Sequence, residues 1–531
     1  MMNKPVLTKY QTSTRNADFP WNNLFFAVIS GILLFLSFPK YGSGLIAWIA
    51  LIPLFWAIKE TKTISRALLL GFITGLIGHI GIIYWITYVV VNYGYLPVYL
   101  GIILMLLLAA YLSLYTAIFA AGIVFFRRRI AVYVMAPVLW VCLEYCKSYF
   151  LTGFPWENLG YSQYLHINLI QFADISGVYG LSFLIVLANA TLLEVIIKRS
   201  RNAFILLSIV ALIIVAILIY GINRTKQVDN YLKNASAIEV LLVQGNIDQS
   251  IKWHESYQKE TINIYEQLSL QNTPAKDGLI IWPETALPFN YQDENDFQQK
   301  VRGIAVKTKN WFIFGSTSYV QQERDKDYYN SAYLLAPDGE IKGKYDKVHL
   351  VPYGEYVPLR DIFPFIRKLT AGMGDFSVGT GYYPLNLDNR KVGVLICYEG
   401  ILPFASRMYK NAGAGLLINI TNDAWFGATS APFQHFFMAV FRAVETKMFL
   451  VRAANTGISG IVSPKGEIIL QTRIFEKAAA KGNVKFAYIQ TIYAQYGDVL
   501  VFICFGFVLI SILWILTGRI KNAGRKYSGN G

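Results

Sequence analysis

Charged residues are scarce in this chain. Asp, Glu, Lys and Arg together make up 15% of its 531 residues, whereas a soluble globular protein carries roughly 25%. Hydrophobic residues make up 54%, and the mean hydropathy is +0.39. This balance argues against a surface that meets only water, and we expect much of the chain to contact lipid.

Cysteine and histidine are also few. The four cysteines are Cys142, Cys146, Cys397 and Cys504, and no CxxC spacing suggests a disulfide framework or a zinc site. The five histidines form no HExxH or similar metal-binding pattern. We therefore expect neither a metal nor an organic cofactor. Only Cys397 lies in a polar, mixed segment, since the other three cysteines lie in apolar runs.

Apolar stretches near the ~20 residues needed to cross a bilayer recur along the chain. The predicted spans are 23–39, 43–58, 67–91, 97–126, 130–149, 170–197, 203–222 and 499–517. The sequence thus predicts an α-helical membrane bundle of about eight helices. Seven of them fall in a membrane domain at 1–222, and the last lies in 498–531 with a basic tail.

The distribution of Lys and Arg between the loops predicts the orientation of these spans. With the N-terminus inside, the short outside loops hold only Lys40 and Lys147. The inside set is Lys4, Lys9, Arg15, Lys59, Lys62, Arg66, Arg127, Arg128, Arg129, Lys198, Arg199, Arg201, Arg519, Lys521, Arg525 and Lys526. Topology accounts for most of the net charge of +15, so we expect no nucleic-acid partner. Both termini are predicted to be cytoplasmic.

The segment 223–497 has an ordinary globular composition and is predicted to lie outside the cytoplasm. Its candidate strands are 237–247, 278–286, 311–320, 331–341, 392–399 and 415–423, and helical patterns cover 254–271 and 403–412. Near-continuous apolar strands are typical of sheets that are covered on both faces. The segment therefore predicts an α/β or layered α+β sandwich.

Three residues at predicted strand ends or in a loop of this domain could carry chemistry. Cys397 ends an apolar run in LICYEG, Glu284 follows another in IIWPETALP, and Lys347 begins KVHLVPYGEYVP. A carboxylate can accept a thiol proton, and a lysine can stabilise a developing oxyanion. Taken singly, each has a plainer interpretation as a buried cysteine, a solvated glutamate or a surface lysine.

Taken in the order Glu, Lys, Cys, the motifs resemble the nitrilase (carbon–nitrogen hydrolase) superfamily. With spans on both sides, the whole chain resembles its membrane-embedded apolipoprotein N-acyltransferase family. The matching segments are 243–253, 282–288, 347–360, 396–400, 419–427 and 452–460, together with GFPWENLGYSQ at 153–163.

The resemblance implies an αββα sandwich for 223–497 and a triad in which Glu284 is the base, Lys347 the oxyanion partner and Cys397 the nucleophile. It also implies supporting or substrate-binding roles for four further residues, which are Glu355, Tyr398, Glu399 and Trp253. Independently of the resemblance, Arg452 and Asn455 in RAANTG are expected to brace the site or its fold, with structural support as the favoured role.

The implied reaction is a ping-pong acyl transfer that completes bacterial lipoprotein maturation. Cys397 takes an acyl chain from a membrane phospholipid as a thioester, and the N-terminal amine of a diacylated apolipoprotein receives it. The resemblance places the protein in the bacterial inner membrane, with the catalytic domain on the periplasmic side. We expect a monomer.

Other functions stay open on the sequence alone. A membrane-tethered amidase would keep the triad but use water, and a transporter or receptor would not need Cys397. A Cys–His protease would need His349 or His435 as its base. His79 and Glu144 lie inside predicted spans, where ionisable groups are candidates for function, but structural roles suit them equally well.

Overall fold

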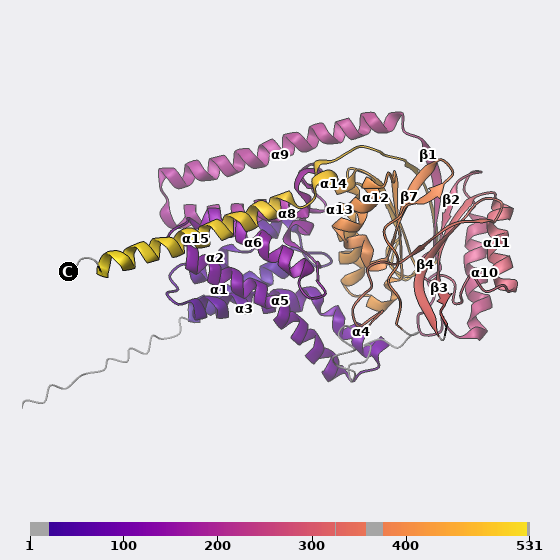
Figure 1. Cartoon of the computed structure of the whole chain (residues 1–531), viewed down its shortest axis with the longest axis horizontal. Helices are drawn as coiled ribbons and strands as arrows, with labels where there is room; N and C mark the ends of the chain where they lie inside the picture. The colour runs from indigo at the N-terminus through magenta and orange to yellow at the C-terminus, as the bar shows by residue number, and fades with distance from the viewer. Residues whose placement is uncertain (1–20, 324, 357–374, 528–531) are drawn as a thin grey trace, which may run out of the picture.

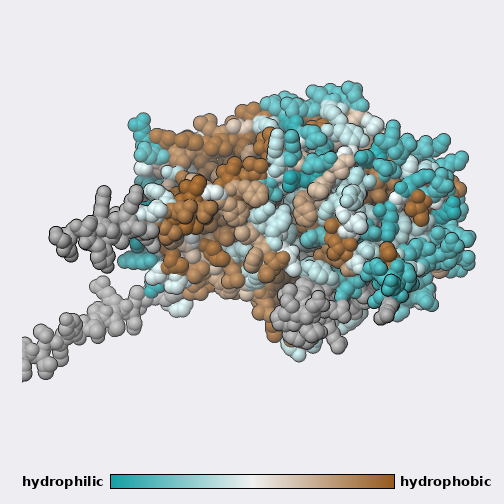
Figure 2. All heavy atoms as spheres, in the orientation of Figure 1, coloured by the Kyte–Doolittle hydropathy of each residue, from teal (hydrophilic) through white to brown (hydrophobic). Residues whose placement is uncertain are grey.

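The computed structural model describes residues 21–323, 325–356 and 375–527. Lys4, Lys9 and Arg15 of the predicted inside set, and residues 357–360 of the predicted lysine motif, lie outside these ranges. The chain forms a helical half and a sheet half that lie end to end (Figure 1). On the face that Figure 2 shows, apolar residues gather over the helical half, while hydrophilic residues cover most of the sheet half and the far end of the helices.

The helical half is built from the N-terminal segment and the last helix. Its elements are α1 (Trp21–Phe35), η1 (Gly44–Trp48), α2 (Ile52–Ile58), α3 (Ile64–Ile83), α4 (Trp85–Gly94), α5 (Val98–Phe126), α6 (Val132–Tyr149), η2 (Leu159–Gln163), α7 (Ile167–Ile170), α8 (Ala173–Lys198), α9 (Arg201–Lys233) and α15 (Val499–Tyr527). Among the described residues, five helices are long and apolar enough to cross a membrane, namely α3, α5, α8, α9 and residues 499–517 of α15. Five of the eight predicted spans therefore have a helix of spanning length, and the full count stays a prediction.

Several predicted spans differ from the helices observed. The span 43–58 consists of two short helices, because Ser43 caps η1 with its side chain and a proline opens α2. The span 67–91 is divided between α3 and α4. The last span before the sheet half was predicted to end at residue 222, but α9 continues to Lys233. Hydropathy falls there, yet no glycine or proline follows to stop the helix.

The sheet half contains two six-stranded sheets. The first has the order β12-β1-β2-β3-β4-β5 and the second β11-β10-β9-β8-β7-β6. The bounds are β1 (Ala237–Gln244), β2 (Leu279–Ile281), β3 (Trp311–Gln321), β4 (Lys326–Leu335), β5 (Ile341–Asp346), β6 (Leu385–Leu387), β7 (Arg390–Ile396), β8 (Leu416–Thr421), β9 (Phe449–Ala454), β10 (Gly460–Val462), β11 (Ile468–Gln471) and β12 (Ala478–Lys485). In each sheet three neighbouring strands are parallel, β1-β2-β3 and β7-β8-β9, and the outer strands pair antiparallel.

Helices cover the outer face of each sheet. The pair α10 (Glu255–Gln271) and α11 (Asp296–Thr308) lies on the first sheet, and α12 (Pro403–Asn411) and α13 (Ala431–Thr446) lie on the second, toward the helical half (Figure 1). The layers are therefore helix, sheet, sheet, helix, as predicted for an αββα sandwich. The short helices η3 (Cys397–Ile401), η4 (Asp423–Phe426) and α14 (Ile492–Tyr496) complete this half.

The predicted strands need two corrections. The range 278–286 forms a strand only at Leu279–Ile281, because Pro283 cannot donate a ladder hydrogen bond and Thr285 has a φ of 44°. The range 331–341 is displaced, because β4 begins at Lys326, where it pairs with Gln321 of β3, and ends at Leu335.

Buried polar contacts join the two halves. The indole Nε1 of Trp156, in the loop between α6 and η2, donates to Gln434 Oε1 of α13 at 2.8 Å. Lys447 Nζ, at the end of α13, donates to Gln171 Oε1 at 2.6 Å. The edge of the sandwich nearest the helical half is thus held in a fixed position relative to the apolar helices.

Candidate active site

Strand ends bring the predicted triad toward one edge of the sandwich, and two of these strands, β2 and β7, have parallel neighbours while β5 pairs antiparallel. Glu284 lies just past β2, Cys397 follows β7, and Lys347 directly follows β5. Glu284 and Lys347 are buried, and Cys397 is half-buried. The Nζ of Lys347 lies 3.9 Å from Glu284 Oε1 and acts electrostatically on the thiol of Cys397. The structure therefore gathers three residues that are spread over more than a hundred positions of the sequence.

Cys397 occupies a strained turn. Its φ of 53° lies in the left-handed region, which a residue with a side chain adopts only at a cost, and strain of this kind clusters at functional sites. Buried strand β7 ends here, and the chain turns at once into η3. A Cβ at Gly400 would lie 2.7 Å from Asn419 Oδ1, so only glycine allows this close approach. Asn419 Nδ2 in turn donates to the backbone oxygen of Leu395 at 3.0 Å.

Burial and charge keep Cys397 as a thiol in the free site. Burial raises the pKa of Cys397 well above its usual range, and the nearby Glu284 carboxylate raises it further. The Lys347 ammonium opposes both effects but does not outweigh them. A thiol in this position needs a base to become a nucleophile.

Glu284 has the surroundings of such a base. Asn330 Nδ2 donates to its Oε1 at 2.7 Å, and the backbone N–H of Asn422 donates to its Oε2 at 2.9 Å. Burial raises the pKa of Glu284, while Lys347 lowers it. A carboxyl with a raised pKa is a better proton acceptor near neutral pH than a solvated one.

Lys347 is paired with a second carboxylate. Its Nζ lies 2.8 Å from Glu355 Oε2, and Asn330 Nδ2 donates to Glu355 Oε1 at 2.9 Å. Burial alone would lower the pKa of the Lys347 ammonium, but Glu355 and Glu284 outweigh it and raise that pKa above its usual value. Lys347 is therefore a permanent cation, and Asn330 links both of its carboxylate neighbours.

Glu399 ties the end of β7 to the loop that follows Lys347. Its Oε1 accepts the backbone N–H groups of Val348 and His349, both at 2.9 Å, and its Oε2 accepts that of Ile396 at 2.8 Å. The hydroxyl of Tyr345 lies 2.9 and 3.0 Å from the two oxygens. Burial raises the pKa of Glu399 to about 7, against the opposing effect of Lys347. Glu399 therefore positions Lys347 relative to Cys397 rather than facing outward.

Tyr398 and Trp253 lie differently. The ring of Tyr398 is buried between two stacked rings, with Trp156 at 6.4 Å and His349 at 5.9 Å between centroids. Tyr398 thus connects the cysteine turn to the loop of the helical half. Trp253 lies 37% exposed on the loop between β1 and α10 and does not bury its ring in the cluster.

The two histidines of the alternative protease mechanism do not stand in equivalent places. His435 Nε2 lies 3.3 Å from the backbone oxygen of Cys397, and its Nδ1 lies 3.0 Å from Asp423 Oδ1. Burial lowers the pKa of His435, and it lowers that of His349 to about 4. Arg452, which also contacts Asp423 at 2.8 Å, belongs to this same buried network. The His435 ring is therefore within hydrogen-bond distance of the backbone oxygen of Cys397.

Sequence reasoning missed Asn330 and gave no role to Asn422 or Lys252. Asn330 is buried inside strand β4, and a buried asparagine side chain normally has hydrogen-bond partners. The Nδ2 of Asn422 donates to Gln249 Oε1 at 2.6 Å. The Oδ1 of Asn422 accepts a hydrogen bond from Asn455 Nδ2 at 3.1 Å. These contacts join strand ends of both sheets, so a search within one motif does not find them.

Two cavities adjoin the helical half or lie inside it. One of about 380 Å³ is bounded by Tyr149, Leu151 and Tyr161 of the helical half and by His349 and Phe404 of the sheet half. It adjoins Tyr398 through the stacked ring of His349.

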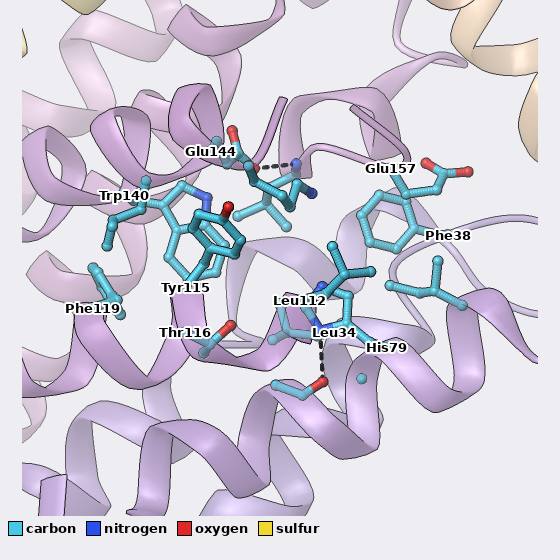
Figure 3. A pocket seen from close by; sticks show the side chains of 16 residues that line it. Leu34, Phe38, His79, Leu112, Tyr115, Thr116, Phe119, Trp140, Glu144 and Glu157 are labelled. Carbon is cyan, nitrogen blue, oxygen red and sulfur yellow. Dashed lines mark hydrogen bonds between the residues drawn. The ribbon is translucent and has the colours of Figure 1, made fainter. Parts of the chain in front are cut away.

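The second cavity, of about 60 Å³, lies within the helical half, where Glu144, Glu157 and His79 line it together with apolar side chains (Figure 3). Glu144 Oε1 accepts the Leu159 N–H at 2.6 Å, and His79 Nδ1 lies 2.8 Å from Gly75 O. Glu144 thus anchors the segment that follows Trp156.

Comparison with known proteins gives two matches to family models. Residues 30–191 match the apolipoprotein N-acyltransferase N-terminal domain, and residues 240–494 match carbon-nitrogen hydrolase. A protein named apolipoprotein N-acyltransferase from Geobacter metallireducens is 44% identical over 91% of this chain and 94% of its own length. One of the same name from Nitrosomonas europaea is 32% identical over 93% and 97%. An amidase from Nesterenkonia sp. has 18% identity and a TM-score of 0.36 over 47% of this chain and 91% of its own.

Proposed function

The chain belongs to the apolipoprotein N-acyltransferase family, and we propose on this basis that it transfers an acyl chain from a membrane phospholipid to a lipoprotein. The acceptor is the α-amine of an N-terminal diacylglyceryl-cysteine on an apolipoprotein. The reaction is the last step of bacterial lipoprotein maturation and passes through a thioester on Cys397.

One observation carries the proposal. Glu284, Lys347 and Cys397 form one cluster in the half of the molecule that adjoins the apolar helices. The cluster contains a nucleophile, a base and a fixed cation, which are the groups that acyl transfer needs. Its place beside helices that are long enough to span a membrane favours a substrate held in the bilayer.

In the first half-reaction, Cys397 Sγ attacks the ester carbonyl carbon of the phospholipid. Glu284 takes the thiol proton as the S–C bond forms, because the buried thiol does not ionise by itself. Lys347 and the backbone N–H of Tyr398 stabilise the oxyanion. The C–O bond then breaks, Glu284 returns the proton to the departing oxygen, and a lysophospholipid leaves.

In the second half-reaction, the acceptor amine attacks the thioester carbon. The α-ammonium must first lose one proton, and the nitrogen loses a second as the amide forms. One of these protons returns to Cys397, and the other leaves the site, so this step releases one proton overall. Glu284 handles both transfers, and Glu355 keeps Lys347 beside the oxyanion. An apolar surround favours the amine over water at the thioester.

The proposed setting is the bacterial inner membrane. Residues 1–222 form its membrane domain, 223–497 its periplasmic catalytic domain and 498–531 its last helix and cytoplasmic tail. About eight helices cross the bilayer, both termini are cytoplasmic, and the protein acts as a monomer. The exposed ring of Trp253 contributes to substrate entry.

A transfer assay distinguishes this function from an amidase that uses water. The purified protein is incubated in detergent with phospholipid of one defined acyl chain and a synthetic diacylated lipopeptide. We expect triacylated peptide and an equal amount of lysophospholipid, and neither from the Cys397→Ala variant. Cys504→Ala, which changes a buried cysteine in α15, serves as the matched control. Free fatty acid in place of triacylated peptide would favour a hydrolase.

A further inference from the structure

One buried lysine next to the base has no part in the mechanism above. Lys252 is completely buried on the loop between β1 and α10. Its Nζ donates to Thr285 Oγ1 at 2.8 Å and lies 3.5 Å from the backbone oxygen of Glu284. A lysine is rarely buried without a partner that compensates its desolvation. Here the contacts are the backbone oxygen of the base and the hydroxyl of the residue after it.

The backbone at this point is tightly constrained. Thr285 has a φ of 44°, in the left-handed region that a β-branched residue avoids. On the other side, a Cβ at Gly315 would lie 2.4 Å from the Thr285 nitrogen and 2.7 Å from the Glu284 Cα. Lys252 therefore holds a strained turn from one side while β3 closes it from the other.

Charges face Glu284 from several elements. Lys347, after β5, and Lys252, on the loop after β1, favour its carboxylate form, while Glu355 disfavours it. Cys397 faces it from the end of β7. Burial lowers the pKa of Lys252 to about 7, and Glu284 alone opposes that effect. Lys347 stays charged throughout the neutral range, so Lys252 is the cation beside the base that changes its charge near neutral pH.

The loop of Lys252 is also fixed to the groups that hold Glu284. Asn422 donates its backbone N–H to Glu284 and its side chain to Gln249 of this loop. The same loop presents the exposed ring of Trp253, next in sequence to Lys252. The loop is therefore connected to Glu284 in two ways, through Lys252 at Thr285 and through Gln249 at Asn422.

We propose that Lys252 is a positioning residue for the acyl transfer, whose ammonium keeps Glu284 in the carboxylate form that accepts the Cys397 proton. The inference rests on the proposed function, because it assigns Lys252 to the same site. On this proposal, the loop between β1 and α10 sets the protonation state of Glu284 through Lys252. Trp253 of the same loop is exposed to solvent.

The test measures the rate of the first half-reaction against pH in single turnovers. Wild type, Lys252→Met and Lys252→Arg are mixed with labelled phospholipid from pH 5.5 to 9, and the acylated Cys397 peptide is quantified. Lys259→Met, which changes an exposed lysine of α10, is the matched control. We expect Lys252→Met to be roughly tenfold slower than wild type at pH 6, the effect of one opposite charge on a neighbouring carboxyl.

The dependence on pH separates this role from a structural one. Above pH 8 Lys252 of the wild type is mostly neutral, so the two rates should converge, and Lys252→Arg should stay fast at pH 6. A loss of equal size at every pH would mean that Lys252 only braces the Thr285 turn, and would overturn the proposal. Equal rates of wild type and Lys252→Met at pH 6 would overturn it as well.

A second measurement keeps the test independent of the substrate. Alkylation of Cys397 by iodoacetamide is followed on the same variants, and it should slow in Lys252→Met at pH 6 but not in Lys259→Met. If wild type forms no acyl-enzyme, the proposed function fails, and alkylation still decides the role of Lys252. If wild type forms it and neither rate depends on Lys252, only this inference fails.

Discussion

Replacing Glu399 with glutamine tests how the site is held together. The carboxylate accepts three backbone N–H groups, from Val348, His349 and Ile396, and also contacts the Tyr345 hydroxyl. An amide of the same shape keeps one oxygen and replaces the other with a donor. The least costly orientation puts the NH₂ group at the Oε2 position, where it faces the Ile396 N–H.

The size of the effect follows from this count. One buried donor left without a partner costs about 1–3 kcal/mol, and the remaining hydrogen bonds lose the extra strength that a charged acceptor gives. We expect Glu399→Gln to lose about 2–4 kcal/mol of stability in total. At about 2–4 °C per kcal/mol for a domain near this size, that corresponds to a fall of roughly 4–16 °C in unfolding temperature.

Catalysis should fall as well. The lost charge loosens the hold on the backbone of Val348 and His349, which directly follow Lys347. A displacement of about 1 Å at a positioned group costs on the order of 100-fold in rate. Thermal unfolding at a matched scan rate and single-turnover acylation of Cys397 measure the two effects. Both are made at pH 8, above the pKa of Glu399.

Glu340→Gln is the matched control, because Glu340 is exposed and its ion pair with Lys342 lies on the surface. Such a pair contributes at most about 1 kcal/mol. If Glu399→Gln matched Glu340→Gln in both unfolding temperature and rate, the view that Glu399 positions Lys347 would be refuted.

Three further predictions concern the same half of the molecule. Lys347→Met should lower the acylation rate by about 100–1,000-fold, the usual cost of one oxyanion donor, with the protein still inserted and folded by gel filtration. Gly315→Ala should slow acylation strongly, since its Cβ would press on the backbone of Glu284 and Thr285; a rate near wild type would contradict that contact. Burial lowers the pKa of Lys410 to about 7, below the ~10.4 of an unfolded chain, so wild-type stability should rise with pH between these values. Lys410→Met should show a smaller rise in unfolding temperature between pH 7 and 9, because Lys252 still contributes to the rise, and an equal slope in both proteins would count against it.

Much of the fold could be predicted from local patterns. Apolar runs located a helix in every predicted span, and the αββα layers followed from the resemblance carried by six motifs. Helix breaks were missed, because hydropathy does not change where Ser43 caps η1 or where α3 passes into α4. The strands β5, β6 and β9 to β12 were also missed, since such segments draw much of their stability from neighbours in the sheet.

Site residues could be predicted only where a local sequence motif contained the residue and indicated its role. Glu284, Lys347 and Cys397 each stand in a motif of their own. Asn330 and Lys252 reach the base from β4 and from the loop after β1. Such contacts depend on the order of strands in the sheet, which no local pattern of these residues contains.

An acyl chain bound to the sulfur of Cys397 would be direct evidence for the proposed thioester. The purified protein is incubated with phospholipid of a defined acyl chain, digested and analysed by mass spectrometry. We predict one acyl chain on the Cys397 peptide, released by neutral hydroxylamine and discharged when a diacylated lipopeptide is added. An unmodified Cys397 peptide under conditions in which the lipopeptide becomes acylated, or an adduct that the lipopeptide does not discharge, would contradict the account.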